Sequence, residues 1–184
     1  MQTSALCARS GTPEPSLLTP FAAGMEATLA QSARLVAAEV AASLPDAETL
    51  LASLPPGALE GSPDTYTRYL VHADPFERFS VMVLVWRPGQ FSPVHGHRTW
   101  CAYRVLRGTL AERHYRWDPA SRTASQVGAV TREAGDTFSV PAGLQHIHSL
   151  GNASDAVAVS LHIYGVEADR ISTGVNLLVD TVTS

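Results

Sequence analysis

Two histidines separated by one residue, His95 and His97, stand in the segment "SPVHGHRTWC". Successive side chains of a β-strand point to opposite faces, so residues at i and i+2 share a face. Two neutral imidazoles on one wall of a sheet form half of a site for a first-row metal ion. The pair predicts a metal site if another segment supplies a further ligand. The alternative is two histidines that face solvent.

A second histidine pair, His146 and His148, lies in "GLQHIHSLGN". These two residues also share one face of an expected strand, so alternation does not decide which of them joins the first pair. Both are candidates for the third metal ligand. A closed structural zinc site is disfavoured, because such sites use four protein ligands and only Cys101 offers a fourth.

The segment "SLHIYG" places Ser160, His162 and Tyr164 on alternate positions of a strand. All three side chains therefore face the same side. Polar side chains inside a protein are costly unless they are hydrogen-bonded. A relay from hydroxyl to imidazole to phenol would fix the tautomer of His162 and direct the Tyr164 hydroxyl into a pocket. The alternative is a buried polar ladder that satisfies only itself.

An arginine, Arg68, shares a strand face with Tyr66 in "YTRYLV". An arginine on a strand is usually a solvated edge residue or a member of a surface ion pair. If Arg68 points into a small barrel, its buried charge requires an anionic partner. A carboxylate fits the planar, forked guanidinium group, so a carboxylate-bearing ligand is the simplest partner.

The elements that must position these residues are mainly short strands. An alanine-rich segment from Phe21 to Leu44 is typical of a helix, and Asp46 is a suitable N-cap for a second helix that ends before Pro55. Seven β-rich runs follow, and such spacing predicts a sandwich or barrel. The runs span residues 65–71, 78–86, 99–106, 109–117, 125–133, 136–141 and 156–165.

We therefore predict an all-β, jelly-roll-like barrel with N-terminal α-helices. Residues 1–16 are expected to be a flexible lead-in, and residues 17–184 a single domain, with helices at about 21–54 and the barrel at about 64–165.

Composition narrows the classes of partner. The 184 residues carry a net charge of -4, which does not favour nucleic acid binding. No apolar run approaches the length of a membrane helix, and the N-terminus lacks the pattern of a secretory signal. Two cysteines, Cys7 and Cys101, do not form a disulfide framework, which favours a cytoplasmic location. We expect a monomer or a weak homo-oligomer.

Two segments resemble the two sequence motifs of the cupin barrels. The segment from Gly89 to Gly108 has the spacing of the first motif, with Cys101 where most cupins have a glutamate, and the segment from Gly135 to Asn152 resembles the second motif. The resemblance covers roughly residues 66–165. The absence of the glutamate leaves three neutral ligands, which suits an anionic ligand such as a thiolate.

Within the cupins the chain resembles the cysteine dioxygenase family of thiol dioxygenases, in its bacterial form. Four segments carry the likeness: "YTRYLV", "SPVHGHRTWC", "IHSLGN" and "SLHIYG". The resemblance implies Fe(II) held by His95, His97 and His148, with a small thiol and O2 as substrates. It implies that Arg68, with Tyr66 beside it, binds the substrate carboxylate.

The family signature implies catalytic roles for Tyr164, His162 and Ser160. Because some relatives with glutamine in place of Arg68 prefer 3-mercaptopropionate, the arginine implies L-cysteine, oxidised to cysteine sulfinate. Mercaptosuccinate and 3-mercaptopropionate are the competing substrates. The competing functions are a non-catalytic metal- or ligand-binding cupin, and a metal-dependent isomerase or carbon-carbon-cleaving dioxygenase. In animal members a cysteine at the position of Cys101 forms a thioether with the tyrosine, here Tyr164, so this crosslink is a further expectation.

Overall fold

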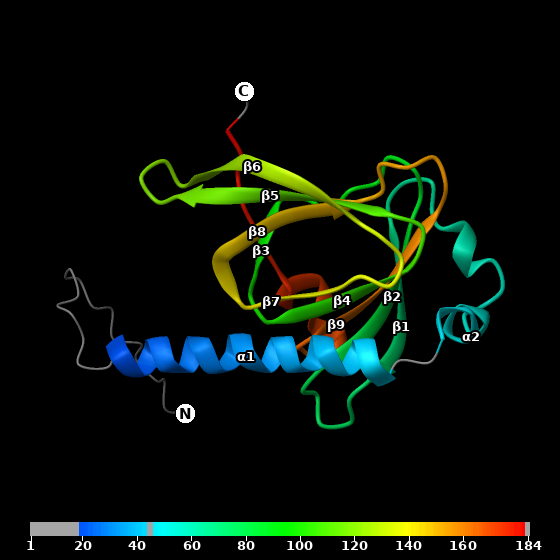
Figure 1. The fold of residues 1–184 in the computed structure, drawn as a ribbon, viewed down its shortest axis with the longest axis horizontal. Helices are drawn as coiled ribbons and strands as arrows, with labels where there is room; N and C mark the ends of the chain where they lie inside the picture. The colour runs from blue at the N-terminus through cyan, green and yellow to red at the C-terminus, as the bar shows by residue number, and fades with distance from the viewer. Residues whose placement is uncertain (1–18, 44–45, 183–184) are drawn as a thin grey trace, which may run out of the picture.

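The computed structural model describes residues 19–43 and 46–182. Its strands form two five-stranded antiparallel sheets that face each other (Figure 1). The first sheet has the order β1 (Thr67–Ala73), β2 (Ser80–Trp86), β9 (Ala158–Tyr164), β4 (Cys101–Arg107) and β7 (Thr137–Val140). The second has the order β10 (Asn176–Leu178), β3 (His95–His97), β8 (Gly143–Gly151), β5 (Leu110–Asp118) and β6 (Thr123–Arg132).

Strand β9 lies in the middle of the first sheet and every one of its residues is buried. Its alternate side chains serve two different cores. Ser160, His162 and Tyr164 face the space between the sheets, whereas Leu161 and its alternating neighbours face outward. The outward face is covered by helices, so both faces of this strand are dry. Full burial of one leucine or valine side chain contributes about 1.5 to 3 kcal/mol to the free energy of unfolding.

Helix α1 (Thr19–Ser43) lies along the outside of β7 and β4 (Figure 1). Its buried positions Ala33, Ala37 and Val40 recur at helical spacing, and small alanines allow the helix to approach the sheet closely. A short helix, α2 (Ala47–Ala52), begins at Asp46, whose carboxylate accepts a hydrogen bond from the Thr49 N–H at 2.9 Å. None of the described helices is long and apolar enough to cross a membrane.

The remaining elements are the short 3-10 helices η1 (Ala58–Glu60) and η2 (Ala168–Arg170) and the one-turn helix α3 (Ile171–Gly174). The predicted all-β fold with N-terminal helices is confirmed, and the seven predicted runs correspond to strands. In the described residues the ladders form two separate sheets rather than one closed ring. Strand β10 lies beyond the predicted barrel limit at 165. The predicted lead-in, 1–16, lies outside the described residues, and the domain boundaries stay a prediction.

Candidate metal centre

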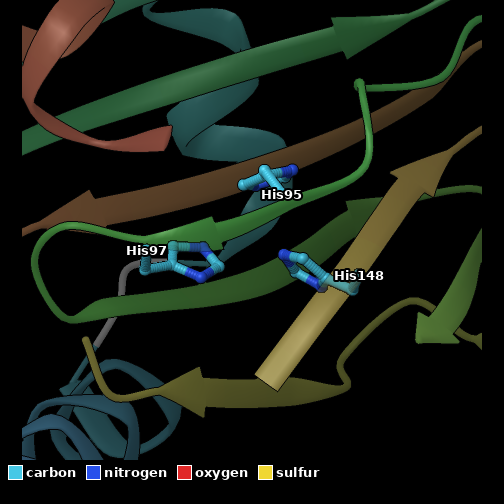
Figure 2. A group of neighbouring side chains, drawn as sticks. All are labelled: His95, His97 and His148. Atoms are coloured by element: carbon cyan, nitrogen blue, oxygen red, sulfur yellow. The ribbon is translucent and has the colours of Figure 1, made fainter. Parts of the chain in front are cut away.

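Three histidines meet between the sheets. His95 and His97 on β3 and His148 on β8 place their ring centroids 4.8 to 5.0 Å from one another (Figure 2). One ring nitrogen of each lies within 4.8 Å of the others, and the residues are only 6, 2 and 5% exposed. Strand pairing explains the meeting, because His95 lies directly opposite His148 in the β3–β8 ladder.

The other candidate ligand, His146, lies elsewhere on β8. It is exposed, and it lines a separate cavity of about 550 Å³ together with His114. His148 is therefore the member of the pair that faces His95 and His97. The role of each histidine as a ligand stays a prediction.

The residue between the two β3 histidines has to be glycine. A Cβ atom on Gly96 would lie 2.6 Å from the carbonyl oxygen of Gly143, closer than real Cβ contacts allow. The ladder between β3 and β8 also shifts register between His95 and His97. Close approach of the two backbones at this glycine allows the third histidine to come next to the first two.

Two of the three rings have a defined tautomer. His148 Nδ1 lies 2.7 Å from the Glu112 carboxylate, and His95 Nδ1 lies 2.8 Å from the Pro93 carbonyl oxygen. Since the carboxylate and the carbonyl are acceptors, each Nδ1 carries the proton and donates it. The Nε2 atoms of these rings are then unprotonated and free to coordinate a metal ion.

The third ring differs, because His97 Nδ1 is buried and has no hydrogen-bond partner among the described residues. Unsatisfied polar atoms in a protein interior are rare and costly. A metal ion coordinated by one nitrogen of each ring fits this arrangement, as three imidazoles suit a first-row transition metal.

Burial keeps His95 and His97 neutral. It lowers the pKa of His95 to about 4, with a further contribution from the nearby His148, and it lowers the pKa of His97 well below the usual value. A neutral imidazole binds a metal without first losing a proton. The site is therefore ready for a cation at neutral pH.

Glu112 on β5 anchors the third histidine and was not found by sequence reasoning. Its carboxylate is 1% exposed, and besides His148 it accepts hydrogen bonds from the Tyr103 hydroxyl at 3.0 Å and from Arg132 Nε at 2.7 Å. Burial opposes ionisation, but the hydrogen bonds from His148 and Arg132 prevail and lower the pKa of Glu112 to about 2. The sequence pattern that could have indicated Glu112 is its position two residues after Leu110, which places this glutamate on the same inward face of the strand as an apolar residue.

The Ser160–His162 pair forms a second polar chain. Trp86 Nε1, which can only donate, lies 2.9 Å from Ser160 Oγ, so this oxygen accepts. The proton of the Ser160 hydroxyl remains available for His162 Nε2, which lies 2.9 Å away. In that arrangement His162 carries its proton on Nδ1, which lies 4.0 Å from Cys101 Sγ. Burial lowers the pKa of His162 to about 3, so the ring is neutral.

The expected continuation of this chain to the Tyr164 hydroxyl is not among the hydrogen bonds of the described residues. The His162 and Tyr164 rings instead stack, with centroids 5.7 Å apart. The Tyr164 hydroxyl has no partner in the described part of the chain, and burial raises its pKa well above the usual value. It is therefore a protonated donor next to the cavity.

Arg68 and Tyr66 lie at the mouth of the same cavity. Tyr66 stacks on Trp86 with ring centroids 4.3 Å apart, and Arg68 Nη2 donates a hydrogen bond to the Tyr66 hydroxyl at 2.6 Å. Arg68 is more exposed than an inward-pointing residue would be, and within the described chain it has no carboxylate partner. Its charge nevertheless contributes to lowering the pKa of His95 and His162.

The cavity itself has a volume of about 20 Å³, which holds roughly one water molecule. A thiol with several heavy atoms therefore needs the exposed side chains at the mouth to move. No acidic side chain of residues 19–43 or 46–182 lines this cavity. Its wall consists of Tyr66, Arg68, Leu84, Trp86, Ser92, His95, His97, Cys101, Tyr103, His148, Leu150, His162, Tyr164 and Asn176.

The sequence of the chain matches the family model for cysteine dioxygenase type I over residues 29–173. The chain belongs to this family. The match includes all three histidines of the cluster, Arg68 and the Ser160–His162–Tyr164 strand. As a member of the cysteine dioxygenase family, the protein is an oxidoreductase of the thiol dioxygenase type. The predicted family and enzyme class are thus confirmed.

Solved structures that resemble this family member include a protein from Thermus thermophilus, with 22% identity, a TM-score of 0.45, and coverage of 57% of this chain and 87% of the other. A cupin superfamily protein from Desulfitobacterium hafniense has 15% identity, a TM-score of 0.44, and coverage of 61% and 90%. An oxalate oxidase in complex with glycolate has 18% identity, a TM-score of 0.44, and coverage of 57% and 53%.

Cys101 and Tyr164, the two residues of the expected thioether, lie directly opposite each other on β4 and β9 of this cysteine dioxygenase family member. Side chains of directly opposed residues project to the same face, and both of these are buried. Burial raises the pKa of the Cys101 thiol, so Cys101 is a neutral thiol in this setting. The pair is thus adjacent, while the bond itself stays a prediction.

Proposed function

We propose that this member of the cysteine dioxygenase family is an Fe(II)-dependent enzyme that converts L-cysteine to cysteine sulfinate. One observation carries the proposal: a single cavity is lined by three buried histidines and by an arginine without a carboxylate partner in the described chain. A metal-binding group and a carboxylate-binding group therefore face the same small volume. A carboxylate-bearing thiol has the two functional groups that these sites bind.

The metal ligands in this proposal are His95, His97 and His148. Imidazole ligands carry no negative charge, so they leave the charge of a divalent ion uncompensated, which favours binding of the substrate as a thiolate. When bound, ferrous iron supplies the redox chemistry by which dioxygen reacts with sulfur. The sulfur of the substrate provides all four electrons and receives both oxygen atoms, so the overall reaction needs no external reductant.

The side chains around the metal site orient the substrate. Arg68, aligned by its hydrogen bond to Tyr66, donates two parallel hydrogen bonds to the carboxylate. This contact fixes the position of the sulfur relative to the three histidines. On the first sheet, across the cavity from the three histidines, the Tyr164 hydroxyl keeps its proton and donates a hydrogen bond into the cavity. Ser160 contacts His162 Nε2 and so orients this ring, which burial keeps neutral, beside Tyr164 and Cys101.

The test uses purified protein reconstituted with Fe(II) under anaerobic conditions. Oxygen consumption and sulfinate formation are measured with L-cysteine, 3-mercaptopropionate and mercaptosuccinate, and the zinc-loaded protein is the matched control. We expect one sulfinate per dioxygen and the highest kcat/KM for L-cysteine. No oxygen consumption with any of these thiols would disprove the dioxygenase proposal. A higher kcat/KM for 3-mercaptopropionate or mercaptosuccinate would disprove only the assigned substrate.

The Cys101–Tyr164 thioether is a second part of the proposal. Its formation removes the thiol hydrogen and one ring hydrogen, with dioxygen as the oxidant. Intact-mass measurement after turnover with L-cysteine would show a fraction of chains lighter by two hydrogens, and C101S would lack it. An unchanged mass throughout would rule out the bond. The cytoplasmic location and the monomeric or weakly oligomeric state also stay predictions.

A further inference from the structure

Asn176 contributes to the cavity from a strand that neither the sequence motifs nor the family match includes. The match to the cysteine dioxygenase family ends at residue 173, and β10 begins at Asn176. In the β10–β3 ladder Asn176 lies directly opposite His97. Opposed residues of an antiparallel pair project to the same face, so the Asn176 amide stands beside the metal-ligand candidate His97 and lines the same cavity.

The backbone on both sides of Asn176 is held in place. The Val175 carbonyl accepts a hydrogen bond from the Arg98 N–H at 2.8 Å, and the Val179 N–H donates to the Val94 carbonyl at 3.1 Å. Val175 is also buried in the core between the sheets. Because these contacts fix the strand, the backbone of Asn176 has a defined position beside β3.

The Asn176 amide has no hydrogen-bond partner among the described residues. Most other polar groups of the cavity wall are already paired: the Ser92 hydroxyl with the Pro93 carbonyl and the Leu150 N–H, and the Tyr103 hydroxyl with Glu112. An amide is both donor and acceptor. Within the described chain, Asn176 is thus the one side chain in this wall that offers an unpaired carbonyl-type acceptor.

The two sheets present different groups to a ligand between them. Arg68, on the first sheet, is the cation that suits a carboxylate, and Asn176, on the second sheet, offers an amide oxygen. None of the acidic side chains that the structure describes lines the cavity. Among the described side chains of its wall, the amide oxygen of Asn176 is therefore the strongest unpaired acceptor for the N–H groups of an amine.

We propose that Asn176 is a specificity-determining residue that accepts a hydrogen bond from the α-amino group of the substrate and so favours amino thiols over thiols without an amine. The proposal rests on the proposed thiol dioxygenase function of the same cavity. A thiol that lacks the amine makes no hydrogen bond to this amide and so gains no binding energy from it.

The experiment compares wild type with Asn176→Ala for L-cysteine and 3-mercaptopropionate, which differ by the amino group. We expect kcat/KM for L-cysteine to fall about tenfold, the usual worth of one neutral hydrogen bond, while kcat/KM for 3-mercaptopropionate changes by less than about twofold. Anaerobic calorimetric titration of both thiols into the iron-loaded protein gives a second readout. Thr173→Ala, at an exposed position of α3, is the matched control and should leave both thiols unaffected.

Asn176→Asp has nearly the same size and keeps the test valid if the alanine variant does not fold. Its carboxylate attracts an ammonium group and repels a substrate carboxylate, so the preference for L-cysteine over 3-mercaptopropionate should rise. Equal losses for both thiols, or no change in the ratio in either variant, would overturn the role of Asn176.

The two proposals fail in different ways. A wild-type protein that neither oxidises nor binds any thiol overturns the proposed function and the role of Asn176 together. A wild-type protein that oxidises 3-mercaptopropionate but not L-cysteine overturns the role of Asn176 and leaves the dioxygenase function standing. An active wild type with an unchanged preference in the variants overturns only the role of Asn176.

Discussion

The two sheets that enclose the cavity are built differently. On the second sheet, His95 and His148 are each held by a hydrogen bond from Nδ1, one to a carbonyl and one to the buried Glu112. On the first sheet, Arg68 and the Tyr164 hydroxyl border the same cavity without a carboxylate partner in the described chain. The two histidines are therefore preorganised before any ligand binds, whereas Arg68 and Tyr164 keep free donors for a ligand.

This difference separates two tasks. Metal coordination requires rings of fixed tautomer and orientation, and neighbouring hydrogen bonds supply both. Substrate binding requires donors that are not already satisfied within the protein, since a paired donor gains little from a new partner. If the division is correct, changes at the histidines of the second sheet and at Glu112 should alter metal binding, and changes at Arg68 on the first sheet should alter thiol binding.

The largest expected effect comes from removing the metal. Dialysis against a chelator should reduce thiol-dependent oxygen consumption by about a thousandfold or more, because metal catalysis is worth several kcal/mol. Addition of Fe(II) should restore it. His97→Ala should show the same loss without restoration. Full activity in protein shown to be metal-free would contradict the assignment of the three histidines to metal coordination.

A change on the first sheet should affect the thiol but not the metal. Arg68→Gln removes a charge-assisted contact worth about 1.5 to 3 kcal/mol, so binding of carboxylate-bearing thiols should weaken about ten- to a hundredfold. Iron content, measured by metal analysis, should stay equal to that of wild type. The exposed Arg87→Gln is the matched control. A loss of iron in Arg68→Gln would show that the two walls are not separate.

The converse change is Glu112→Gln on the second sheet, which keeps the shape and removes the charge. The amide holds His148 less firmly and in a less defined tautomer, and loss of such a neighbour costs about ten- to a hundredfold in metal affinity. Competitive metal titration against a chromophoric chelator measures this directly, independently of turnover. Thiol affinity at saturating iron should change little. Unchanged metal affinity would mean that Glu112 only balances the charge of Arg132.

Counted for one ring and one pH unit, the smallest expected effect is a dependence of stability on pH in the metal-free protein. The pKa values of His95, His97 and His162 are lowered in the folded state, mainly by burial. Below the unfolded pKa of about 6.5 the unfolded chain therefore binds more protons than the folded one. The free energy of unfolding should fall as the pH drops from about 6.5 toward about 4, by up to about 1.4 kcal/mol per pH unit for each ring.

Urea unfolding of the metal-free protein at several pH values measures this slope. His162→Asn removes the contribution of the first sheet and should leave that of His95 and His97. The difference in bound protons between the unfolded and folded states, which sets the slope, should therefore fall by about one. A stability that is constant over this range would show that the rings are not held neutral.

Sequence patterns were reliable where local geometry decides. The i, i+2 spacing of His95 and His97 and the alternation of Ser160, His162 and Tyr164 follow from the pleat of a single strand. The cap at Asp46 and the helix that follows depend only on neighbours in the chain. These predictions needed no knowledge of which strands pair.

Features that join distant segments were not accessible in this way. Glu112 reaches His148, 36 residues further along the chain, and Trp86 reaches Ser160, 74 residues further, only because particular strands became neighbours. Asn176 was missed because β10 has only three residues and no alternating pattern. Its place opposite His97 is set by pairing with β3.

The sequence by itself therefore determined the family of the protein, the all-β fold, and which side chains share a strand face, because backbone alternation is a local property. Alternation within the strand left His146 and His148 open, and the family resemblance favoured His148; the tertiary structure places His148 beside His95 and His97 and gives His95 and His148 their hydrogen-bond acceptors. The physical reason is that both depend on strand register and on buried hydrogen-bond partners, which long-range packing brings together.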